Sequence, residues 1–374
     1  MDLATLPGGT LPDIQSIDHA LELLKNLSLR DPSATTAAAP SPWFIGVGLH
    51  KPHIPLKFPK QYLDLYPLAS IRQPAVVDVP AGLPPVAYDT FTDVRSRMDT
   101  TAVVNRANVT FPYGLFPMNF TLRIRQHYFA AVSYIDAEAG RLLDYVNKTA
   151  SIMDKTIVVL FGDHVRDSDG SGAECFERMF WSLKMGGWGA PWPLRIRYLR
   201  SRASDRARLH SLPALETPQC CADRVWFAIL LDIQGWQLGD RGEWAKYSTC
   251  DTATRTPLII RTAVGSSTAL ARRAATQGGI RFSAALVELV DLFATLADLA
   301  GLAVPPICPE LPSSVNVSVG LPSFCTEGTS FKAALDQPAA WLGKPAAFSQ
   351  YPRPSDAPGD HSDLPDCDTI TRMG

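Results

Sequence analysis

The sequence predicts an α/β protein, an α/β/α sandwich built on a mainly parallel sheet. Short continuous apolar runs occur at 43–49, 156–161 and 257–260. Runs of this kind are typical of strands that are covered on both faces. Between and after them lie stretches whose apolar residues recur at helical spacing, and strands that alternate with helices favour parallel pairing.

The first predicted helix is amphipathic and covers roughly 17–27, ahead of a Ser/Ala/Pro-rich linker that ends near Pro42. The strand at 43–49 follows the linker. From His50 to about Pro117 the chain is rich in proline and turn residues. We therefore expect a long excursion with little regular structure there.

The clearest helix covers 122–147, where apolar residues at spacings of three and four form one stripe. Another helix is expected over 286–299, because Gly301 and then Pro305-Pro306 stop it. The stretch 165–234 follows neither the strand nor the helix period for long. It carries four of the eight Trp and three of the seven Cys. An irregular insertion of that length inside a compact domain needs its own explanation.

Composition excludes several classes of function. Hydrophobic residues make up 46% and charged residues 19%, which is typical of a globular protein. A formal net charge of −2 gives no basic field for nucleic acid, so no nucleic-acid partner is expected. No apolar run reaches the length of a membrane span.

Five glycosylation sequons indicate a secretory history, although Met1 to Gly9 shows no signal peptide. We therefore expect the N-terminus to be incomplete. The sequons lie at Asn26, Asn108, Asn119, Asn147 and Asn316. None of the seven cysteines forms a CxxC pair, so no structural zinc site is expected. Cys308 and Cys325 bracket a Pro/Ser-rich loop and are candidates for a local disulfide, which spacing alone does not decide.

Polar residues follow two of the predicted strands. His50-Lys51-Pro52-His53 comes after the first strand, and Gly162-Asp163-His164 after the second. Ligands of open parallel sheets bind beyond the carboxyl ends of the strands. Asp is a hard oxygen ligand for Ca²⁺ or Mg²⁺, and His and Lys suit an anionic ester oxygen. Spacing alone leaves the ordinary alternatives open: a turn or helix cap at the second strand, and proline-held loop histidines at the first.

A third candidate is the segment 235–246, in which repeated Gly and aromatic residues precede Lys246. This composition is typical of a tight, ordered loop near a ligand. A structural loop with solvated charges is the alternative.

Several stretches resemble the sulfatase family, in the same order along the chain. They are WFIGVGLHKPHIP at 43–55, GLPPVAY at 82–88, YFAAVSYID at 128–136, GEWAKYS at 242–248, LVELV at 286–290 and FSQYPRPSD at 348–356. Together they cover nearly all of the chain outside 165–234, and their shared order makes the resemblance specific.

The resemblance implies an alkaline-phosphatase-like fold, a lysosomal location and hydrolysis of sulfate esters, most like removal of the 2-sulfate from iduronate in heparan and dermatan sulfate. Sulfated glycosaminoglycan is then the expected partner. By position, Asp163 and His164 match residues of a Ca²⁺ site, His50 a histidine that contacts the sulfate or leaving group, and Lys246 a lysine that binds the sulfate. Arg241 stands where many sulfatases have His, which puts that contact in doubt.

The chain also departs from the family. It contains no C-x-P-x-R or S-x-P-x-R motif, the place of the cysteine that becomes the formylglycine nucleophile. The paired Asp residues of the family's N-terminus are absent too. We therefore expect a sheet that is incomplete at both ends and a chain that is inactive as given. Two alternatives stay open: a phosphoester hydrolase of the same superfamily, and a non-catalytic protein that binds sulfated glycan through His50, Lys51 and Lys246.

The family sequence runs directly from Asp163-His164 into Gly235-Trp236. We therefore predict part of the catalytic domain at 1–164, its continuation at 235–304 and the start of a C-terminal subdomain at 305–374. Codons for Val165-Arg166 and Gln234 can encode a splice donor and acceptor. The insertion at 165–234 is accordingly predicted to be a retained intron translated in frame, with a disordered, lineage-specific loop as the alternative.

Overall fold

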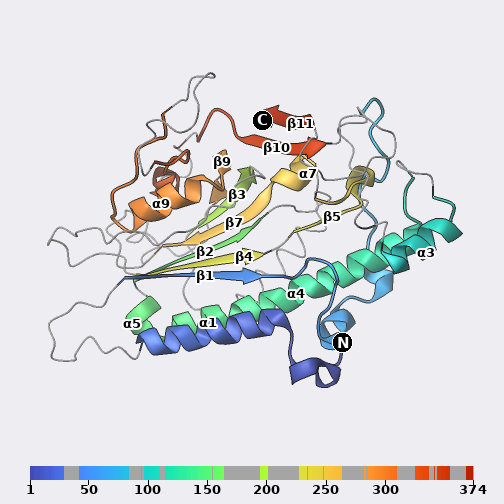
Figure 1. Cartoon of the computed structure of the whole chain (residues 1–374), viewed down its shortest axis with the longest axis horizontal. Helices are drawn as coiled ribbons and strands as arrows, with labels where there is room; N and C mark the ends of the chain where they lie inside the picture. Colours follow the sequence, from blue (N-terminus) through green and yellow to red (C-terminus); the bar gives the residue numbers. More distant parts are fainter. Residues whose placement is uncertain are drawn as a thin grey trace.

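The computed structural model shows a mixed sheet with helices on both faces (Figure 1), which confirms the predicted α/β class. Residues are described over 1–28, 42–83, 94, 97–109, 114–153, 155–163, 194–200, 227–233, 235–246, 248–262, 282–283, 285–309, 325–336, 341, 343–353 and 368–373. No helix in these ranges is long and apolar enough to cross a membrane.

The main sheet has seven strands, and most of its pairings are parallel. Its order is β1 (Trp43–Leu49), β4 (Phe227–Ile233), β2 (Thr156–Gly162), β7 (Thr256–Arg261), β3 (Leu194–Arg200) and β8 (Phe282–Ser283), with β9 (Val287–Glu288) also paired to β3. Strand β4 is parallel to both β1 and β2, whereas β7 is antiparallel to both of its neighbours. Strands β8 and β9 are parallel to β3. The prediction of a mainly parallel sheet is confirmed.

One face of the sheet is covered by α1 (Pro12–Ser28), α4 (Met118–Lys148) and α5 (Ala150–Met153), as Figure 1 shows. The apolar stripe of α4 turns towards the sheet and α1, as its spacing predicts. The buried core there includes Ile17 and Leu24 of α1 and Tyr134, Ile135, Leu142 and Val146 of α4.

The opposite face carries α9 (Asp291–Leu299), and α10 (Lys332–Asp336) contributes to the core beneath it. Strand β2 lies between the two helical layers. Its Val158 and Leu160 belong to the core below α4, and Ile157 and Val159 belong to the core below α9. This two-sided burial explains why β2 is a continuous apolar run.

Strand β1 has the predicted bounds but is covered on one face only. Ile45 and Leu49 are buried, whereas Gly46, Gly48 and Phe44 are exposed, Phe44 to 54%. The prediction that this strand is covered on both faces is therefore wrong. Its outward positions are two glycines and one Phe, so that face offers little apolar surface to a covering helix.

The excursion from His50 to Pro117 has little regular structure in its described residues, which contain one helix, α3 (Met98–Arg106), and two 3₁₀ turns, η3 (Lys60–Leu65) and η4 (Leu68–Ser70). One further prediction needs correction. The predicted helix over 286–299 is divided into β9 and α9. The Asp291 carboxylate at the start of α9 accepts a hydrogen bond from the Glu288 N–H at 2.8 Å. This contact at the boundary separates the strand from the helix.

The segment 165–234 contributes β3 and β4 to the main sheet, and β4 lies between β1 and β2. This differs from the irregular conformation expected for it, because Phe227–Ile233 is itself an apolar run that suits a central strand. The rest of the segment lies outside the described residues. The domain division and the retained-intron origin stay predictions.

The remaining described elements are short. Near the N-terminus lie η1 (Leu3–Thr5) and η2 (Pro7–Gly9). A small antiparallel pair, β5 (Gln237–Leu238) and β6 (Trp244–Ala245), encloses η6 (Asp240–Gly242) and is followed by α7 (Asp251–Thr254). The antiparallel pair β10 (Phe348–Arg353) and β11 (Asp368–Met373) ends the chain.

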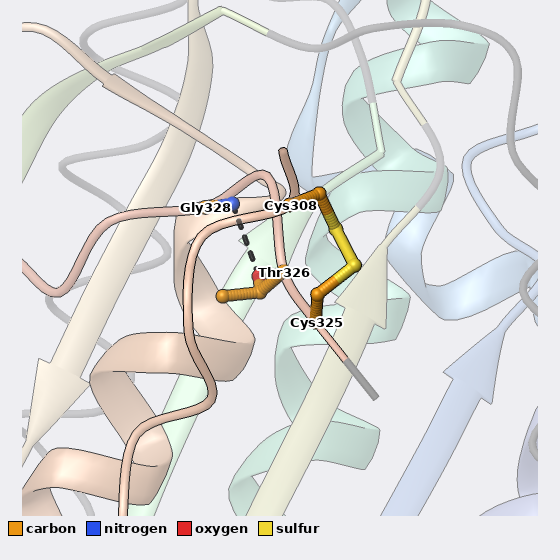
Figure 2. The surroundings of a disulfide bond; sticks show 4 residues. All are labelled: Cys308, Cys325, Thr326 and Gly328. Atoms are coloured by element: carbon orange, nitrogen blue, oxygen red, sulfur yellow. Dashed lines mark hydrogen bonds between the residues drawn. A yellow bond between two sulfur atoms is a disulfide. The ribbon is translucent and has the colours of Figure 1, made fainter. Parts of the chain in front are cut away.

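Cys308 and Cys325 form a disulfide that closes a loop with a sequence separation of 17 (Figure 2). The suggested pairing is therefore confirmed. The Cys308 N–H also donates to the Thr326 carbonyl at 2.9 Å. The Thr326 hydroxyl in turn accepts from the Gly328 N–H at 3.0 Å, so the closed loop is anchored to the chain that leads towards α10.

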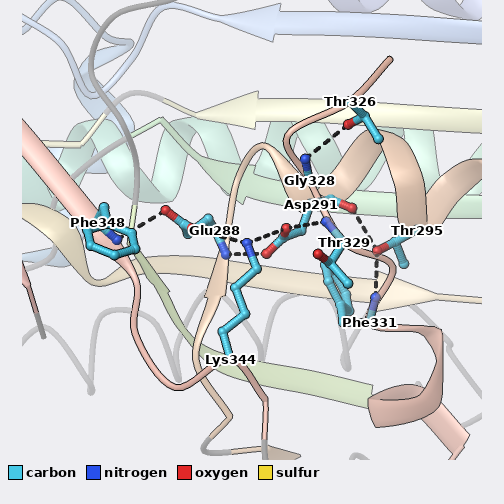
Figure 3. Close-up of polar contacts among 9 residues, drawn as sticks. All are labelled: Glu288, Asp291, Thr295, Thr326, Gly328, Thr329, Phe331, Lys344 and Phe348. Atoms are coloured by element: carbon cyan, nitrogen blue, oxygen red, sulfur yellow. Dashed lines mark hydrogen bonds and ion pairs between the residues drawn. The ribbon is translucent and has the colours of Figure 1, made fainter. Parts of the chain in front are cut away.

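A buried ionic cluster joins the C-terminal part of the chain to α9 (Figure 3). The Lys344 ammonium lies 2.7 Å from carboxylate oxygens of both Glu288 and Asp291. Asp291 also accepts from the Thr329 N–H at 2.7 Å, and Glu288 from the Phe348 N–H at 3.1 Å. The cluster thus holds together β9, the start of α9 and the start of β10.

Candidate active site at the carboxyl ends of β1 and β2

The sheet brings His50 and Asp163 to the same edge. Both β1 and β2 are parallel to β4, and Leu49 and Gly162 are each in register with Ile233 of β4. The next residue along each strand is a predicted site residue. Two strand spacings separate them, so the backbones at His50 and Asp163 lie about 10 Å apart.

The loop after β1 is held by its own polar groups and by α1. The His50 N–H donates to the buried Asp13 carboxylate, and the Lys51 ammonium donates to the His53 carbonyl at 2.7 Å. The His53 N–H donates to the His50 carbonyl at 3.0 Å and closes the turn. The two imidazole rings lie 5.0 Å apart between centroids. The exposed His50 and the half-buried His53 are therefore neighbours, and the buried Asp13 and Lys51 lie beneath them.

The tautomer of His53 follows from its contact. Its Nδ1 lies 2.5 Å from the Ile54 carbonyl oxygen, which can only accept. Nδ1 therefore carries the proton in the neutral ring, and Nε2 is left as an acceptor.

Both imidazoles are disfavoured in their charged form. Burial lowers the pKa of His50, the Lys51 and Lys246 cations lower it further, and Asp13 opposes them. Burial also lowers the pKa of His53, with contributions in the same direction from Lys246, His50 and Lys51. The histidines are thus neutral near pH 7 and gain a proton only in acid.

Lys51 was considered a glycan contact from the sequence, but the structure places it differently. Its side chain is only 4% exposed and its ammonium donates inwards to the His53 carbonyl. Burial lowers the pKa of Lys51 to about 8, against the attraction of Asp13. Lys51 therefore lies beneath the two histidines instead of facing solvent.

Lys246 is brought to this site by the small β5–β6 pair. It is half-buried, and its charge acts on both His50 and His53. The turn before it is tightly built: Gly239 has φ of +91°, and a Cβ there would meet the Trp244 ring at 2.8 Å. Only glycine is tolerated at that position. The loop is therefore tightly ordered, and its predicted place near a ligand stays a prediction.

A fully buried arginine supports the same loop. Arg125 of α4 donates to the carbonyls of Leu238 and Arg72, at 3.1 and 2.9 Å. Arg241, the residue that stands where many sulfatases have His, is exposed, and its N–H donates to the Val76 carbonyl at 2.6 Å. Its backbone has φ of +54°, so the loop holds a non-glycine residue in a left-handed conformation.

Asp163 is half-buried, and its carboxylate accepts from the Gly235 N–H at 3.2 Å. Asp163, two residues before the segment 165–234, is therefore in contact with Gly235, the residue that follows it. His164 lies outside the described residues. In the described part of the chain, no three His, Cys, Asp or Glu side chains gather as a metal site. Asp163 offers an oxygen ligand that Ca²⁺ accepts, but the described residues do not assemble a complete shell.

The sequence indicated His50, Lys246 and Asp163, whose roles stay predictions, and it did not indicate Asp13. No local signal marks Asp13, because an Asp at the start of a helix is ordinary. Its role depends on a contact 37 residues away in sequence. As a whole the site presents imidazoles and a lysine at one sheet edge, which suits recognition of an anion and proton transfer to or from it.

The chain is similar to known proteins along its whole length. The profile of the sulfatase family matches residues 13–302. Iduronate 2-sulfatase of Homo sapiens is 34% identical, and that of Mus musculus 33%, each covering 100% of this chain and 55% of the relative. The chain thus spans about half the length of these relatives. A solved phosphonate monoester hydrolase of Agrobacterium radiobacter is 15% identical, with a TM-score of 0.49 over 96% of this chain and 50% of that one.

Proposed function

Because this chain belongs to the sulfatase family, we propose that the protein hydrolyses sulfate esters. The observation that carries the proposal is the register of β1 and β2 on β4, which brings His50 and Asp163 to one sheet edge, and the charge of Lys246 acts on His50 and His53 there. A sulfate monoester bears a negative charge before reaction, and negative charge develops on the bridging oxygen as the S–O bond breaks. Preorganised cations and donors stabilise both.

We assign two roles from the geometry. Lys246 binds a non-bridging sulfate oxygen, since its ammonium lies at the edge of the site. The exposed His50 would protonate the leaving sugar oxygen when a nucleophile bonds to sulfur and the S–O bond to the sugar breaks, and no residue of this chain is assigned as that nucleophile. The lowered pKa of His50 makes the protonated ring a stronger acid, and this form accumulates under acidic conditions.

The family's Ca²⁺ site is proposed for Asp163 and His164. A bound divalent cation would polarise the sulfate oxygens as a Lewis acid. The proposal is supported by the place of Asp163 directly after β2, where its carboxylate accepts from the Gly235 N–H. Since the 374 residues contain no C-x-P-x-R motif, we propose that this chain by itself binds the ester without turnover.

The finer proposal is that the substrate is the 2-sulfate of iduronate in heparan or dermatan sulfate and that the protein acts in the lysosome. It is supported by 34% and 33% identity to proteins named iduronate 2-sulfatase and by the five sequons. An acidic compartment would also protonate His50, as the proposed proton transfer requires.

Calorimetric binding of a heparin disaccharide carrying 2-sulfated iduronate to the 374-residue chain tests this function. We expect binding at pH 5, and a loss of about tenfold or more in Lys246→Met and in His50→Ala. Lys60→Met, an exposed lysine outside the site, serves as the matched control and should bind as the unaltered chain does.

A second measurement compares ligands. The same disaccharide without its 2-sulfate should bind to the chain at least about tenfold more weakly. Equal affinity for both sugars would overturn the 2-sulfate assignment, and tighter binding of a phosphate ester would indicate a phosphoester hydrolase. Equal loss in Lys60→Met and Lys246→Met would show that binding is non-specific.

A further inference from the structure

Two buried charges of opposite sign lie beneath the His50 loop without a role in the proposed chemistry. Asp13, in the first turn of α1, is 2% exposed, and Lys51 is 4% exposed. Buried carboxylates and ammonium groups are expensive to maintain unless other groups compensate them. Their presence under one short loop therefore requires an explanation.

Each charge holds the backbone of one histidine. The Asp13 carboxylate accepts from the His50 N–H, and the Lys51 ammonium donates to the His53 carbonyl at 2.7 Å. Hydrogen bonds to charged groups are stronger than those between neutral groups. Helix α1 thereby determines where the loop leaves β1, and Lys51 determines where its turn closes.

The same charges act on the His50 ring. Four titratable groups face it: Asp13 from α1, Lys51 and His53 from its own loop, and Lys246 after β6. Asp13 raises the pKa of His50, whereas Lys51 and Lys246 lower it beyond the effect of burial. Asp13 and Lys51 thus oppose each other at this ring.

We propose that Asp13 and Lys51 are positioning residues, which hold His50 and His53 from below and act on His50 with opposite electrostatic effects. The catalytic part of this inference rests on the proposed function, because it assigns Asp13 and Lys51 to the support of His50 as the proton donor. The effect of the two charges on the His50 ring does not depend on turnover. A test that observes His50 directly therefore separates this inference from the sulfatase proposal.

The test is an NMR titration of the histidine ring signals in the full 374-residue chain, with the His50 signal identified by its absence in His50→Ala. Asp13→Asn keeps an oxygen acceptor for the His50 N–H and removes the charge. It should lower the His50 midpoint by about half a pH unit. Lys51→Met removes the cation and should raise the midpoint by a similar amount.

Two variants serve as matched controls. Asp18→Asn makes the same change on the same helix at an exposed position, and Lys60→Met repeats the lysine change outside the site. Both should leave the His50 midpoint in place. Displacements of the His50 midpoint in opposite directions in Asp13→Asn and Lys51→Met support the proposal. Loosening of the loop alone would displace the midpoint in the same direction in both variants. Displacements of the same sign, or none, would overturn it.

A measurement on the unaltered chain remains if Lys51→Met does not fold. Lys51 has a pKa of about 8, so its deprotonation should appear as a second, smaller inflection in the His50 ring signal near that pH. Lys51→Arg keeps the positive charge and should remove this inflection, since Arg stays charged throughout. A single-step titration of His50 in the unaltered chain would contradict the electrostatic effect of Lys51.

Discussion

Lys51 and Lys344 are both largely withdrawn from solvent, yet their environments shift their pKa values in opposite directions. Burial lowers the pKa of Lys51 to about 8, because the attraction of Asp13 does not offset desolvation. For Lys344, desolvation also favours the neutral form, but hydrogen bonds to Asp291 and Glu288 outweigh it and raise the pKa.

The difference distinguishes the candidate active site around Lys51 from a structural cluster, hereafter the clasp, formed by Lys344, Glu288 and Asp291. At Lys344 two carboxylates lie 2.7 Å from one ammonium, and further N–H donors satisfy those carboxylates, so the charges are compensated (Figure 3). At Lys51 the positive charge is only partly balanced, and its field reaches the two histidines. A compensated buried pair destabilises the fold when one partner is removed, whereas an unbalanced buried charge perturbs the pKa values of its neighbours.

Removal of Lys344 should have the largest effect on stability. Lys344→Met leaves Asp291, which is 1% exposed, without its cation, and the free energy of unfolding should fall by about 3–4 kcal/mol. Urea denaturation measures this. Lys332→Met is the control, because its partner Asp298 and Lys332 itself are about one-third exposed, and it should cost under about 1 kcal/mol. Equal losses of stability in Lys344→Met and Lys332→Met would show that the buried Lys344 cluster contributes no more than a partly exposed ion pair.

Opening the Cys308–Cys325 disulfide should have the next largest effect, in the same part of the chain. A loop of this length lowers the entropy of the unfolded chain, so Cys308→Ser with Cys325→Ser should lower the free energy of unfolding by about 3 kcal/mol. The His50 midpoint should not change. A displaced midpoint would show that the clasp and the site are coupled.

The sequence was most informative where one period dominates. The apolar stripe at 122–147 and the runs at 156–161 and 257–260 became α4, β2 and β7 with small changes at their ends. The stretch 286–299 misled because Leu286-Val-Glu-Leu-Val290 suits a strand as well as a helix. Only the Asp291 contacts separate β9 from α9 there. Likewise, the sequence did not indicate β3 and β4, because the segment 165–234 follows neither the strand nor the helix period for long.

The sequence could indicate candidate site residues where they follow a strand. Ligands gather at the carboxyl ends of parallel strands, and the structure brings His50 and Asp163 to one such edge, while their roles stay predictions. The buried position of Lys51 was not foreseen, since a lysine between histidines in sequence gives no sign of the direction of its side chain. Asp13 needed the packing of α1 against β1, which is a tertiary property. His164 lies outside the described residues, so its prediction stays open.

The pH dependence of stability should reveal Lys51. Between pH 8 and 10.5 the unfolded chain keeps a proton on this lysine that the folded chain has released, so the free energy of unfolding rises with pH. The rise should reach about 2–3 kcal/mol relative to Lys51→Met. Lys344 contributes the opposite sign, because its raised pKa gives stability that is lost only as pH exceeds its unfolded value of 10.5. Denaturation curves at pH 7, 8, 9 and 10 measure the slope, and a flat difference between the two chains would contradict it.

The smallest expected effect concerns Lys246. The Lys246 charge lowers the pKa of His53 more than the charge of any other nearby cation does, and it also lowers the pKa of His50. Lys246→Met should therefore raise both ring midpoints, by a few tenths of a pH unit, since Lys246 is half-buried and partly screened by solvent. Raising the salt concentration should shrink this displacement while leaving that of Lys51→Met nearly intact, because a buried charge is screened less. If salt changed the midpoint displacements of Lys246→Met and Lys51→Met equally, the Lys51 charge would not act from the protein interior. The electrostatic contrast between Lys51 and the paired Lys344 would then be lost.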